Sequence, residues 1–383
     1  MDVLIAGAGP AGSIAALVLA RAGVRVRLID RDRFPRGKLC GDTLNPGALA
    51  LLDRLGVAAD VRARALPVSG MLVTGPHGAR VVGDYGPGMY GAAITRRDLD
   101  GILLDAAVRA GAVFEEGVAI RHPLVEGTRV VGVRLAGASG DADLHARVVI
   151  AADGRHSRLA FGLGLSRFAA RPRRWAFGAY YAGVTALTGC GEMHIRPEGY
   201  IGIAPVPGGI ANVCVVREWR RGATPSMHGD VIAQAIAGDS MLRERFRHAG
   251  RVGVVATLGP LAVESRGAGA HGLLLAGDAA GFIDPMTGDG LRFAIRGAEL
   301  AAAAALRELE TGAATHRALA RERMREFGGK WRLNRTLRAL VASPRGIDLA
   351  AALMSRWGAP LRSLIAVSGD VSLANRLRSS HPS

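Results

Sequence analysis

Lysine and aromatic residues are both scarce in this chain of 383 residues. Lys38 and Lys330 are the only lysines, so arginines spread through nearly every segment carry almost all of the formal net charge of +16. Such an even excess of arginine is typical of a compositional bias rather than of one binding surface. Aromatic residues make up 5% of the chain, which is few for the stacking platforms that hold nucleic-acid bases. We therefore expect no nucleic-acid partner.

Cysteine is scarce as well, and its spacing argues against several kinds of site. Cys40, Cys190 and Cys214 lie far apart, with no Cys-x-x-Cys pair and no cluster of cysteine and histidine. This pattern predicts no metal site, no four-cysteine iron–sulfur cluster and no disulfide framework. No stretch reaches about 18 uninterrupted apolar residues, the length of a membrane-spanning helix, and the N-terminus lacks a basic leader. We expect a cytoplasmic protein with reduced thiols.

The first 30 residues contain a βαβ dinucleotide-binding pattern. A short apolar run, Val3–Ala6, precedes the sequence GAGPAG, a helical pattern and a second apolar run, Val24–Ile29. Gly7 allows a tight turn, Gly9 lets a pyrophosphate approach the backbone, and Gly12 lets helix and strand pack closely. The helix N-terminus then offers free N–H groups to the phosphates. This pattern predicts a nucleotide site without distinguishing FAD from NAD.

An acidic residue and three later motifs extend the pattern. Asp30 ends the second apolar run, where a carboxylate accepts hydrogen bonds from a ribose. Residues 148–158, VVIAADGRHSR, indicate a buried strand and a turn, and residues 92–112 indicate a strand and a helix, with Arg96 just before the helix. Residues 272–290, GLLLAGDAAGFIDPMTGDG, indicate another buried strand, a glycine-rich turn and the start of a helix.

These motifs resemble those of flavoproteins built on the plan of p-hydroxybenzoate hydroxylase. GDAAGFIDPMTGDG is similar to their GD motif and DGRHS to their DG motif. RDRFPRGKLCGDTLNPGALALLDRLGV, residues 31–57, resembles the geranylgeranyl reductase branch of that superfamily, which also contains flavin-dependent halogenases. The resemblance covers about residues 1–300 and implies that the bound dinucleotide is FAD.

The resemblance implies an α/β fold with a Rossmann-type FAD-binding domain, an antiparallel-sheet substrate domain and a C-terminal helical region. The expected boundaries are 1–70, 91–162 and 268–304 for the FAD-binding domain, 71–90 and 163–267 for the substrate domain, and 305–383 for the helical region. Alternating apolar and polar residues favour the antiparallel sheet, with candidate strands at 175–184, 200–206 and 210–218.

The resemblance also implies which residues bind FAD. Asp278 would bind the ribityl chain. Pro285 and the turn 287–290 would lie against the isoalloxazine, where the N–H groups of a helix N-terminus stabilise negative charge on the reduced ring. The implied cofactor-binding residues are Gly7, Gly9, Ala11, Gly12, Asp30, Arg31, Lys38, Cys40, Gly41, Arg96, Asp153, Gly154, Gly277, Asp278, Pro285, Gly288, Asp289 and Gly290.

The implied substrate pocket departs from the family pattern. Geranylgeranyl reductases often carry Tyr-x-Trp-x-Phe-Pro on the sheet above the isoalloxazine, whereas this chain has Tyr200, Gly202, Ala204 and Pro205 in the matching places. Because two large rings are missing, we expect a bulky, hydrophobic substrate, unless neighbouring side chains refill the space. The halogenase signature Trp-x-Trp-x-Ile-Pro is also absent, which argues against halogenation.

Cys40 is the one candidate catalytic residue. It lies in the stretch KLCGD, which approaches the flavin in this branch, and a thiol there could donate a proton or shape the substrate face. A buried free cysteine is, however, more often a small apolar filler. The chain has no second glycine-rich βαβ pattern, so we expect NAD(P)H to act as a transient reductant.

Three functions fit these motifs. The first is an FAD-dependent oxidoreductase that reduces C=C bonds of a bulky hydrophobic metabolite by hydride transfer from the flavin. The second is an FAD-dependent monooxygenase that hydroxylates an aromatic or polyketide-like substrate with NAD(P)H and oxygen. The third is a flavin electron carrier to a quinone or a partner protein. The KLCGD stretch, Tyr200 and Pro205 favour the reductase.

The C-terminal region predicts basic helices at 305–327, 331–342 and 346–357, followed by a final segment. Residues 305–383 contain 14 basic and 6 acidic residues, a net charge of +8. Leucines and arginines alternate between Arg332 and Leu340, which fits either an anionic membrane surface that supplies a lipid-like substrate or a helical cap with solvated arginines.

The membrane interpretation predicts binding to vesicles that depends on salt. The protein should sediment with vesicles of anionic phospholipid at low ionic strength and be released at high ionic strength, because screening removes the attraction. Vesicles of zwitterionic lipid are the control. The absence of salt-sensitive sedimentation would leave the helical cap as the explanation.

Overall fold

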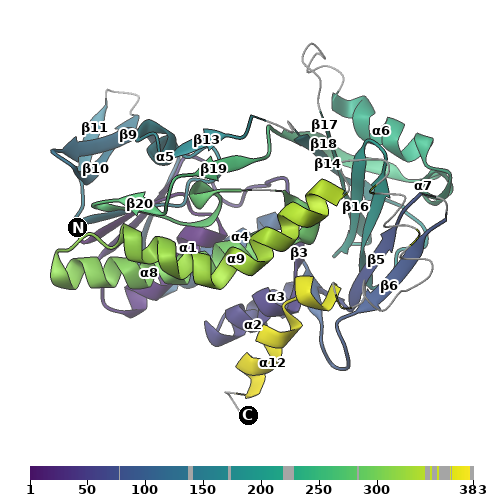
Figure 1. Cartoon of the computed structure of the whole chain (residues 1–383), viewed down its shortest axis with the longest axis horizontal. Coiled ribbons are helices and arrows are strands. Elements are labelled where there is room, and N and C mark those ends of the chain that lie inside the picture. The colour runs from purple at the N-terminus through teal and green to yellow at the C-terminus, as the bar shows by residue number, and fades with distance from the viewer. Residues whose placement is uncertain are drawn as a thin grey trace.

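The computed structural model contains two large sheets with helices packed around them (Figure 1). It describes residues 1–76, 78–136, 141–170, 174–218, 228–282, 284–340, 346, 352, 363 and 365–379. Figure 1 shows the N-terminal sheet and its helices at one end of the molecule and a large antiparallel sheet at the other. The observed architecture is the expected α/β fold.

The N-terminal sheet has six strands, which are parallel except at one edge. Their order is β20 (Gly269–Ala270), β21 (Leu273–Leu275), β12 (Val148–Ala151), β1 (Val3–Ala6), β2 (Val26–Asp30) and β8 (Val113–Glu116), and only β20 is antiparallel to its neighbour. In β1, Val3 and Ile5 join one hydrophobic cluster, while Leu4 and Ala6 join another. A strand covered on both faces needs apolar residues at every position, which explains the unbroken apolar run.

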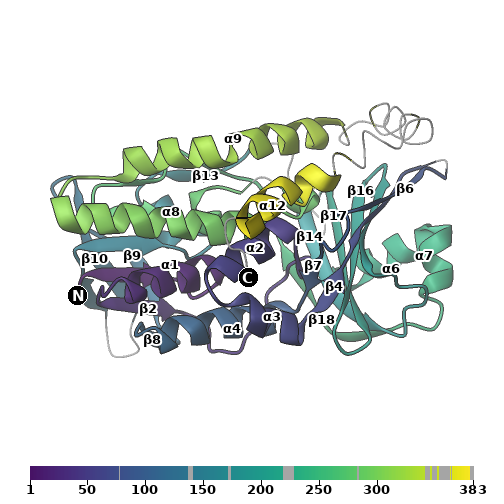
Figure 2. The ribbon, with the colours of Figure 1, turned by 90° about the horizontal axis from the view of Figure 1, so that it is seen from below.

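Different elements cover the two faces of this sheet. One face carries α1 (Pro10–Arg21), α4 (Arg96–Arg109) and α8 (Gly290–Thr311). The other carries α5 (Arg158–Gly162) and a three-stranded sheet of β11 (Ala142–His145), β10 (Arg129–Ala136) and β9 (Ala119–Glu126). Figure 2 shows α8 and α9 (His316–Leu340) running side by side along the same side of the molecule. Arg96 is the first residue of α4 rather than the residue before it.

The second large sheet has seven strands, of which all but one neighbouring pair are antiparallel. Their order is β18 (Gly250–Leu258), β14 (Arg174–Ala182), β17 (Ile210–Glu218), β16 (Gly199–Val206), β15 (Cys190–Arg196), β5 (Gly70–Thr74) and β6 (Arg80–Asp84), with β15 and β5 parallel. In β17, Val213 and Val215 pack toward the side that carries α6 (His228–Gly238) and α7 (Ser240–Arg245). Asn212, Cys214 and Val216 point the other way, toward the cavity described below.

Short elements connect the two sheets. They are β3 (Thr43–Leu44), α2 (Pro46–Arg54), α3 (Ala58–Arg64), β4 (Leu66–Val68), β7 (Gly91–Ala93), β13 (Ser166–Phe168), β19 (Val263–Ser265) and the 3-10 turns η2 (Gly277–Ala280) and η3 (Pro285–Thr287). β7 pairs with both β3 and β4, and β13 pairs with β19. These links hold residues 38–45, 277–282 and 284–290 between the sheets.

The expected helix at 305–327 is wrong. Helix α8 continues to Thr311 and ends where Gly312 adopts a left-handed conformation with φ of +70°, as helix C-caps commonly do. The buried carboxylate of Glu308 then accepts hydrogen bonds from the N–H and hydroxyl groups of Thr315, at 3.1 and 2.8 Å. This turn separates α8 from α9 at a point where the apolar pattern alone gave no break.

The expected break between 327 and 331 is also wrong. Helix α9 runs without interruption through Gly328 and Gly329, although each glycine costs about 1 kcal/mol of helix propensity. Phe327 is fully buried and stacks edge-on against Phe293 of α8, with ring centroids 5.0 Å apart. Packing against α8 therefore outweighs the local propensity. The expected helix at 346–357 lies almost wholly outside the described residues.

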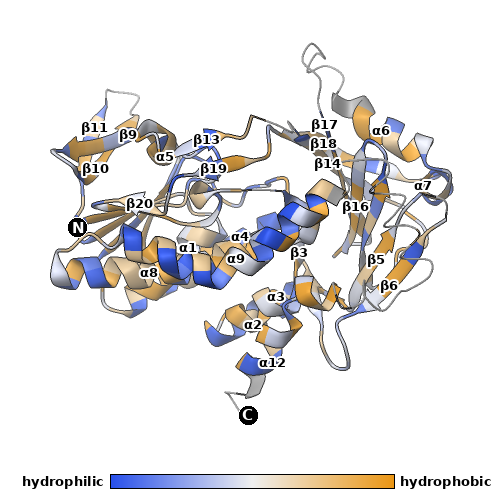
Figure 3. Ribbon diagram, viewed as in Figure 1, coloured by the Kyte–Doolittle hydropathy of each residue, from blue (hydrophilic) through white to orange (hydrophobic). Residues whose placement is uncertain are grey.

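Hydrophilic residues are frequent along α9, whereas hydrophobic residues dominate the strands of both large sheets (Figure 3). Among the described residues, no helix combines the length and the apolar composition that crossing a membrane requires. The other helix in the C-terminal part with defined bounds is α12 (Val371–Ser379), which packs beside α2.

Candidate active site

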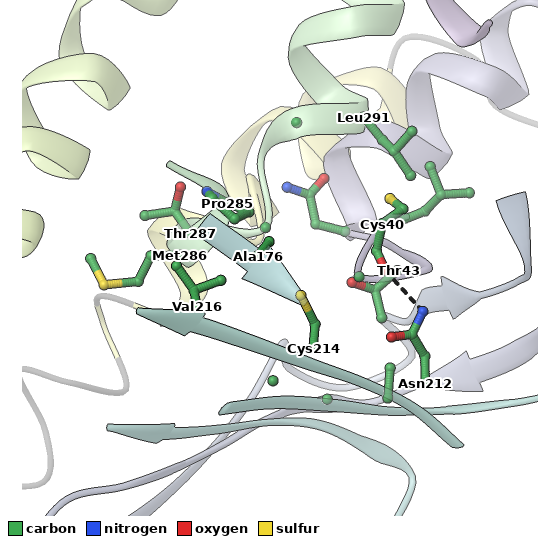
Figure 4. A pocket seen from close by; sticks show the side chains of 18 of the residues that line it. Cys40, Thr43, Ala176, Asn212, Cys214, Val216, Pro285, Met286, Thr287 and Leu291 are labelled. Carbon is green, nitrogen blue, oxygen red and sulfur yellow. Dashed lines mark hydrogen bonds between the residues drawn. The ribbon is translucent and has the colours of Figure 1, made fainter. Parts of the chain in front are cut away.

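A cavity of about 560 Å³ lies between the six-stranded and seven-stranded sheets, within the usual range for small-molecule pockets. Fifteen of the sequence-predicted residues line it: Gly9, Ala11, Lys38, Cys40, Gly41, Arg96, Gly154, Tyr200, Gly202, Ala204, Gly277, Asp278, Pro285, Gly288 and Gly290. Figure 4 shows side chains from the η3 turn, residues 40–43 and the seven-stranded sheet around the same space. The predicted residues that do not line it are Gly7, Gly12, Asp30, Arg31, Asp153, Pro205 and Asp289.

The glycine-rich turn places bare backbone beside two arginines. A Cβ atom on Gly9 would lie 3.6 Å from a guanidinium nitrogen of Arg36 and 3.9 Å from one of Arg96. Gly7 and Gly12 lie behind this surface, because a Cβ on Gly7 would meet the Ala152 carbonyl oxygen at 2.5 Å and a Cβ on Gly12 would clash with the Gly7 carbonyl. Gly9 therefore leaves room for a ligand, while the other two glycines allow close packing.

Arg96 is a buried cation at the N-terminus of α4. Its guanidinium donates two hydrogen bonds of 2.8 Å to Asp100, and Arg36 lies 3.1 Å from the same carboxylate. Burial would lower the pKa of Arg96, but Asp100 and the Cys40 sulfur outweigh burial and raise it. A permanent charge at this place suits a pyrophosphate.

Two further cations, Lys38 and Arg155, line the cavity together with the acids Asp278 and Glu192. Desolvation by the surrounding atoms and the charge of Arg96 lower the pKa of the Lys38 ammonium, although this residue is exposed by its accessible surface. Burial also lowers the pKa of Arg155 to about 10, although the nearby Asp278 carboxylate opposes the shift. The Nε atom of Arg155 is buried and has no hydrogen-bond partner. Removing these cations from water costs free energy, which a bound anion would recover. Their position next to bare backbone fits an anionic dinucleotide such as FAD.

Asp30 and Arg31, both expected to bind the cofactor, do not line the cavity. The Asp30 carboxylate accepts a 2.7 Å hydrogen bond from the backbone N–H of Ala8 and one of 2.9 Å from Asp32. It thus fixes the glycine-rich turn, and its contact with a ribose stays a prediction. Arg31 is largely exposed and lies 3.8 Å from Asp32. Asp153 similarly accepts a 2.8 Å hydrogen bond from the N–H of Arg158, at the start of α5.

The turn before α8 presents backbone to the cavity. Pro285, Gly288 and Gly290 line the space, and Gly288 adopts φ of +67°. Asp289 points elsewhere and forms an ion pair of 2.5 Å with Lys330. Since no side chain caps α8, its first N–H groups are free for a ligand. This arrangement fits the isoalloxazine position that the resemblance implies.

The seven-stranded sheet is hollowed at Gly202. A Cβ atom there would meet nothing closer than the carbonyl oxygens of Cys214, at 3.8 Å, and of Glu192, at 4.0 Å. No side chain therefore lies within 4 Å of the place that a Cβ on Gly202 would take. Tyr200 donates a 2.7 Å hydrogen bond to Asp284 in the loop before η3. This bond ties the sheet to the turn that faces it.

Three residues that the sequence analysis did not single out hold the KLCGD stretch against the sheet. Asp42 is fully buried and adopts φ of +53°. Its Oδ2 atom accepts hydrogen bonds of 2.6 Å from the Tyr180 hydroxyl and from the Asn212 amide. The same amide donates a 2.8 Å bond to the Cys40 carbonyl, drawn in Figure 4. In the sequence, the only indication of this contact was that the polar Asn212 interrupts the apolar strand 210–218.

The surroundings of Asp42 and Cys40 raise the pKa of both groups, so each keeps its proton to a higher pH than usual. Burial raises the pKa of Asp42 to about 6, although the bonds from Tyr180 and Asn212 oppose the shift. The other carboxylate oxygen of Asp42 is buried without a partner. Burial likewise raises the pKa of the Cys40 thiol, while Arg96 opposes the shift. Cys40 is therefore a neutral thiol at the cavity wall.

Asp42 is expected to make stability depend on pH. Its folded pKa of about 6 lies above the reference value of 3.8, so the folded protein holds a proton that the unfolded chain has released between these values. The free energy of unfolding should therefore fall as the pH rises from about 4 to about 6, by at most about 3 kcal/mol from this group.

Urea denaturation of Asp42→Asn and of wild type across this pH range measures the effect. The slope due to Asp42 should vanish in Asp42→Asn and persist in Asp105→Asn, which alters an exposed carboxyl group on α4. Equal slopes in wild type and Asp42→Asn would contradict the assignment.

Lys38→Met is expected to weaken FAD binding about tenfold or more, because a hydrogen bond from a charged donor contributes about 1.5–3 kcal/mol. Titration of the apoprotein with FAD, followed by flavin fluorescence, gives the dissociation constant. Arg33→Met removes an exposed cation from the same segment and should leave the constant unchanged. Equal losses in both variants would show a general effect of charge instead.

Comparison with known proteins agrees with this geometry. Residues 1–325 match the family described as FAD binding domain. The menaquinone reductase of Mycobacterium tuberculosis is 32% identical over 333 residues, which cover 79% of this chain and 75% of that protein. Digeranylgeranylglycerophospholipid reductase 2 of Methanopyrus kandleri is 32% identical over 332 residues, covering 82% of this chain and 79% of that protein.

Among solved structures, the flavin-dependent brominase Bmp2 has a TM-score of 0.83 over 99% of this chain and 97% of that one, at 20% identity. This likeness confirms the fold class and says nothing of the reaction. The relatives confirm the resemblance to the geranylgeranyl reductases. The chain belongs to the FAD binding domain family, as an FAD-dependent oxidoreductase related to the geranylgeranyl reductases.

Proposed function

We propose that this protein reduces C=C bonds in a bulky, hydrophobic molecule. The observation that carries the proposal is the wall of the cavity opposite the glycine-rich turns. Most of its residues are apolar, among them Met193, Ile195 and Val216, although Asn212 and Glu192 also line it, and a Cβ on Gly202 would have no side chain within 4 Å. An apolar wall facing a flavin binds an uncharged substrate by excluding water from it.

The names of the two relatives support a reductase. One is a menaquinone reductase and the other a digeranylgeranylglycerophospholipid reductase. Menaquinone and digeranylgeranylglycerophospholipids both carry long polyprenyl chains with isolated C=C bonds. The class of substrate that we propose is accordingly a lipid or quinone with such a chain, together with a wider group that the space at Gly202 accommodates.

The reaction divides between the cofactor and the residues of the cavity. When bound, reduced FAD supplies two electrons to the double bond as a hydride equivalent, and NAD(P)H binding transiently is our proposed source of these electrons. The second carbon of the bond needs a proton. Cys40 Sγ can supply it, because burial keeps this thiol protonated. The charge of the nearby Arg96 guanidinium opposes the rise in the pKa of this thiol and would stabilise the thiolate that remains.

A monooxygenase that hydroxylates an aromatic or polyketide-like substrate is the second candidate. The observation that favours it is the same hollow at Gly202, since a fused ring system fills a wide space better than a single prenyl chain. The two reactions differ in their products. Reduction adds two hydrogens without oxygen, whereas hydroxylation requires oxygen and adds one oxygen atom.

The test is a single turnover with chemically reduced, FAD-loaded enzyme under anaerobic conditions. The substrates are menaquinone and a digeranylgeranyl glycerolipid, and any quinol is reoxidised in air before analysis. Mass spectrometry with fragmentation is expected to find two added hydrogens within the prenyl chain. A product that forms only with oxygen and contains an added oxygen would favour the monooxygenase. An intact chain after reoxidation of the quinol would favour an electron carrier.

Cys40→Ala serves as the matched variant for proton delivery. General acid catalysis contributes about 10²–10⁴-fold, so the single-turnover rate should fall in that range while the dissociation constant for FAD stays within about threefold of wild type. Cys190→Ala, which removes a thiol outside the cavity, should leave the rate unchanged. An undiminished rate in Cys40→Ala would remove the thiol from the mechanism.

A further inference from the structure

The segment 365–379, here called the C-terminal strap, returns from the end of the chain to the cavity. It consists of a helical turn at 365–368, two turn residues and α12. Figures 1 and 2 both show α12 lying against α2, close to the near end of the antiparallel sheet. Ile365, Ser368 and Gly369 line the cavity. The strap therefore supplies part of the wall of a site that is otherwise built from residues between Gly9 and Ala294 and from Leu337 of α9.

Ile365 forms the apolar part of this wall. Its side chain is 5% exposed and belongs to a hydrophobic cluster with Val68 and Tyr85, which also line the cavity. The Cδ1 atom of Ile365 lies where a Cβ on Gly83 would be only 2.6 Å away. The absence of a side chain on Gly83 thus lets Ile365 reach across to β6. Together these contacts close the cavity on the side formed by Met71 and Val73 of β5 and by Tyr85.

The backbone of the strap is hydrogen-bonded to the N-terminus of α2. The N–H of Gly47 donates a 3.0 Å hydrogen bond to the Gly369 carbonyl, and the Asn45 amide donates one of 3.0 Å to the Ser368 carbonyl. A Cβ on Gly47 would lie 2.3 Å from the Cβ of Asp370. Helix α2 therefore needs glycine at this position for the strap to fit.

Buried charges hold the strap in place. The Asp370 carboxylate accepts a 2.7 Å hydrogen bond from Arg292 of α8 and lies 3.0 Å from the Lys330 ammonium of α9. Lys330 also donates a 3.2 Å bond to the Ser368 carbonyl and pairs with Asp289. All four side chains are at most 12% exposed. Breaking a buried network of ion pairs costs several kcal/mol. The network therefore fixes the strap against α8 and α9.

We propose that Ile365 is a specificity-determining residue, which sets how long a hydrophobic substrate the cavity admits. This inference rests on the proposed function, because it assumes that an apolar chain occupies the cavity. The chain would run from the reacting bond near Cys40 and the η3 turn toward the wall formed by β5, Tyr85 and Ile365. A smaller residue at position 365 lengthens this path, and a larger one shortens it.

The test measures binding rather than turnover. The oxidised, FAD-loaded full chain is titrated with geraniol, farnesol and geranylgeraniol, and the change in flavin absorbance gives each dissociation constant. Each buried methylene contributes about fourfold in affinity. Ile365→Val and Ile365→Ala are expected to strengthen binding of geranylgeraniol relative to geraniol by about fourfold and by more than about tenfold. Ile365→Phe should weaken geranylgeraniol binding by about tenfold or more and leave geraniol binding unchanged.

Val367→Ala is the matched control, because Val367 belongs to the same strap but is 53% exposed. Its three dissociation constants should equal those of wild type. If wild type binds the prenols and the Ile365 variants keep its dependence on chain length, the role of Ile365 is wrong and the proposed function stands. If wild type binds none of the three prenols, both proposals fail. Ile365→Val changes one methylene and provides the comparison even if Ile365→Ala does not fold.

Discussion

Buried carboxylates hold the two sheets of this protein at the distance that creates the cavity. Asp42, in the segment that follows β2, accepts hydrogen bonds from Tyr180 and Asn212 of the seven-stranded sheet. Asp284, before η3, accepts one from Tyr200 and lies 3.4 Å from Arg174. A buried carboxylate without donors would cost several kcal/mol, so the sheet must stay where its donors meet these acids. The cavity lies where the apolar cores of the two sheets end, next to the polar seam that Asp42, Asp284 and their hydrogen-bond donors form between the sheets.

The same seam separates two chemical environments within one cavity. On the side of the six-stranded sheet lie the bare backbone at Gly9 and the cations Lys38, Arg96 and Arg155, which suit the phosphates of a dinucleotide. On the other side the seven-stranded sheet presents apolar side chains and the space next to Gly202. Cys40 lies where the two environments meet. An anionic cofactor and an uncharged substrate are thus placed by different forces in one continuous space.

The C-terminal part of the chain completes the site through buried charges and through the apolar contacts of Ile365. Lys330 neutralises Asp289 at the start of α8 and also contacts the strap at Ser368 and Asp370. The lysine that stabilises the turn before α8 therefore also positions the wall that Ile365 forms. Asn334 of α9 adds a 3.0 Å hydrogen bond to the Thr287 hydroxyl in the same turn. The geometry of the cofactor side and of the substrate wall is coupled through α9.

The sequence by itself determined the parts of this protein that depend on local backbone geometry. A strand, a glycine-rich turn and a helix follow one another within about 30 residues, so GAGPAG and GDAAGFIDPMTGDG reveal the nucleotide site and the turn before α8 without knowledge of the remaining chain. The α/β class followed from the resemblance that these motifs carry, and alternating apolar and polar residues favoured the antiparallel strands. Gly202 was identified because a family pattern placed a large ring there.

Only the tertiary structure decided which distant residues meet. Asp42 and Asn212 are 170 positions apart, and no local pattern records that an asparagine amide completes the KLCGD stretch. The end of α8 and the continuity of α9 depended on Glu308 and Phe327, whose contacts outweigh the helix propensity of nearby glycines. Ile365 reached the cavity because Gly83 and Gly47 leave room for the strap. Such contacts arise from packing in three dimensions, where the energy of a residue depends on neighbours that the sequence does not place beside it.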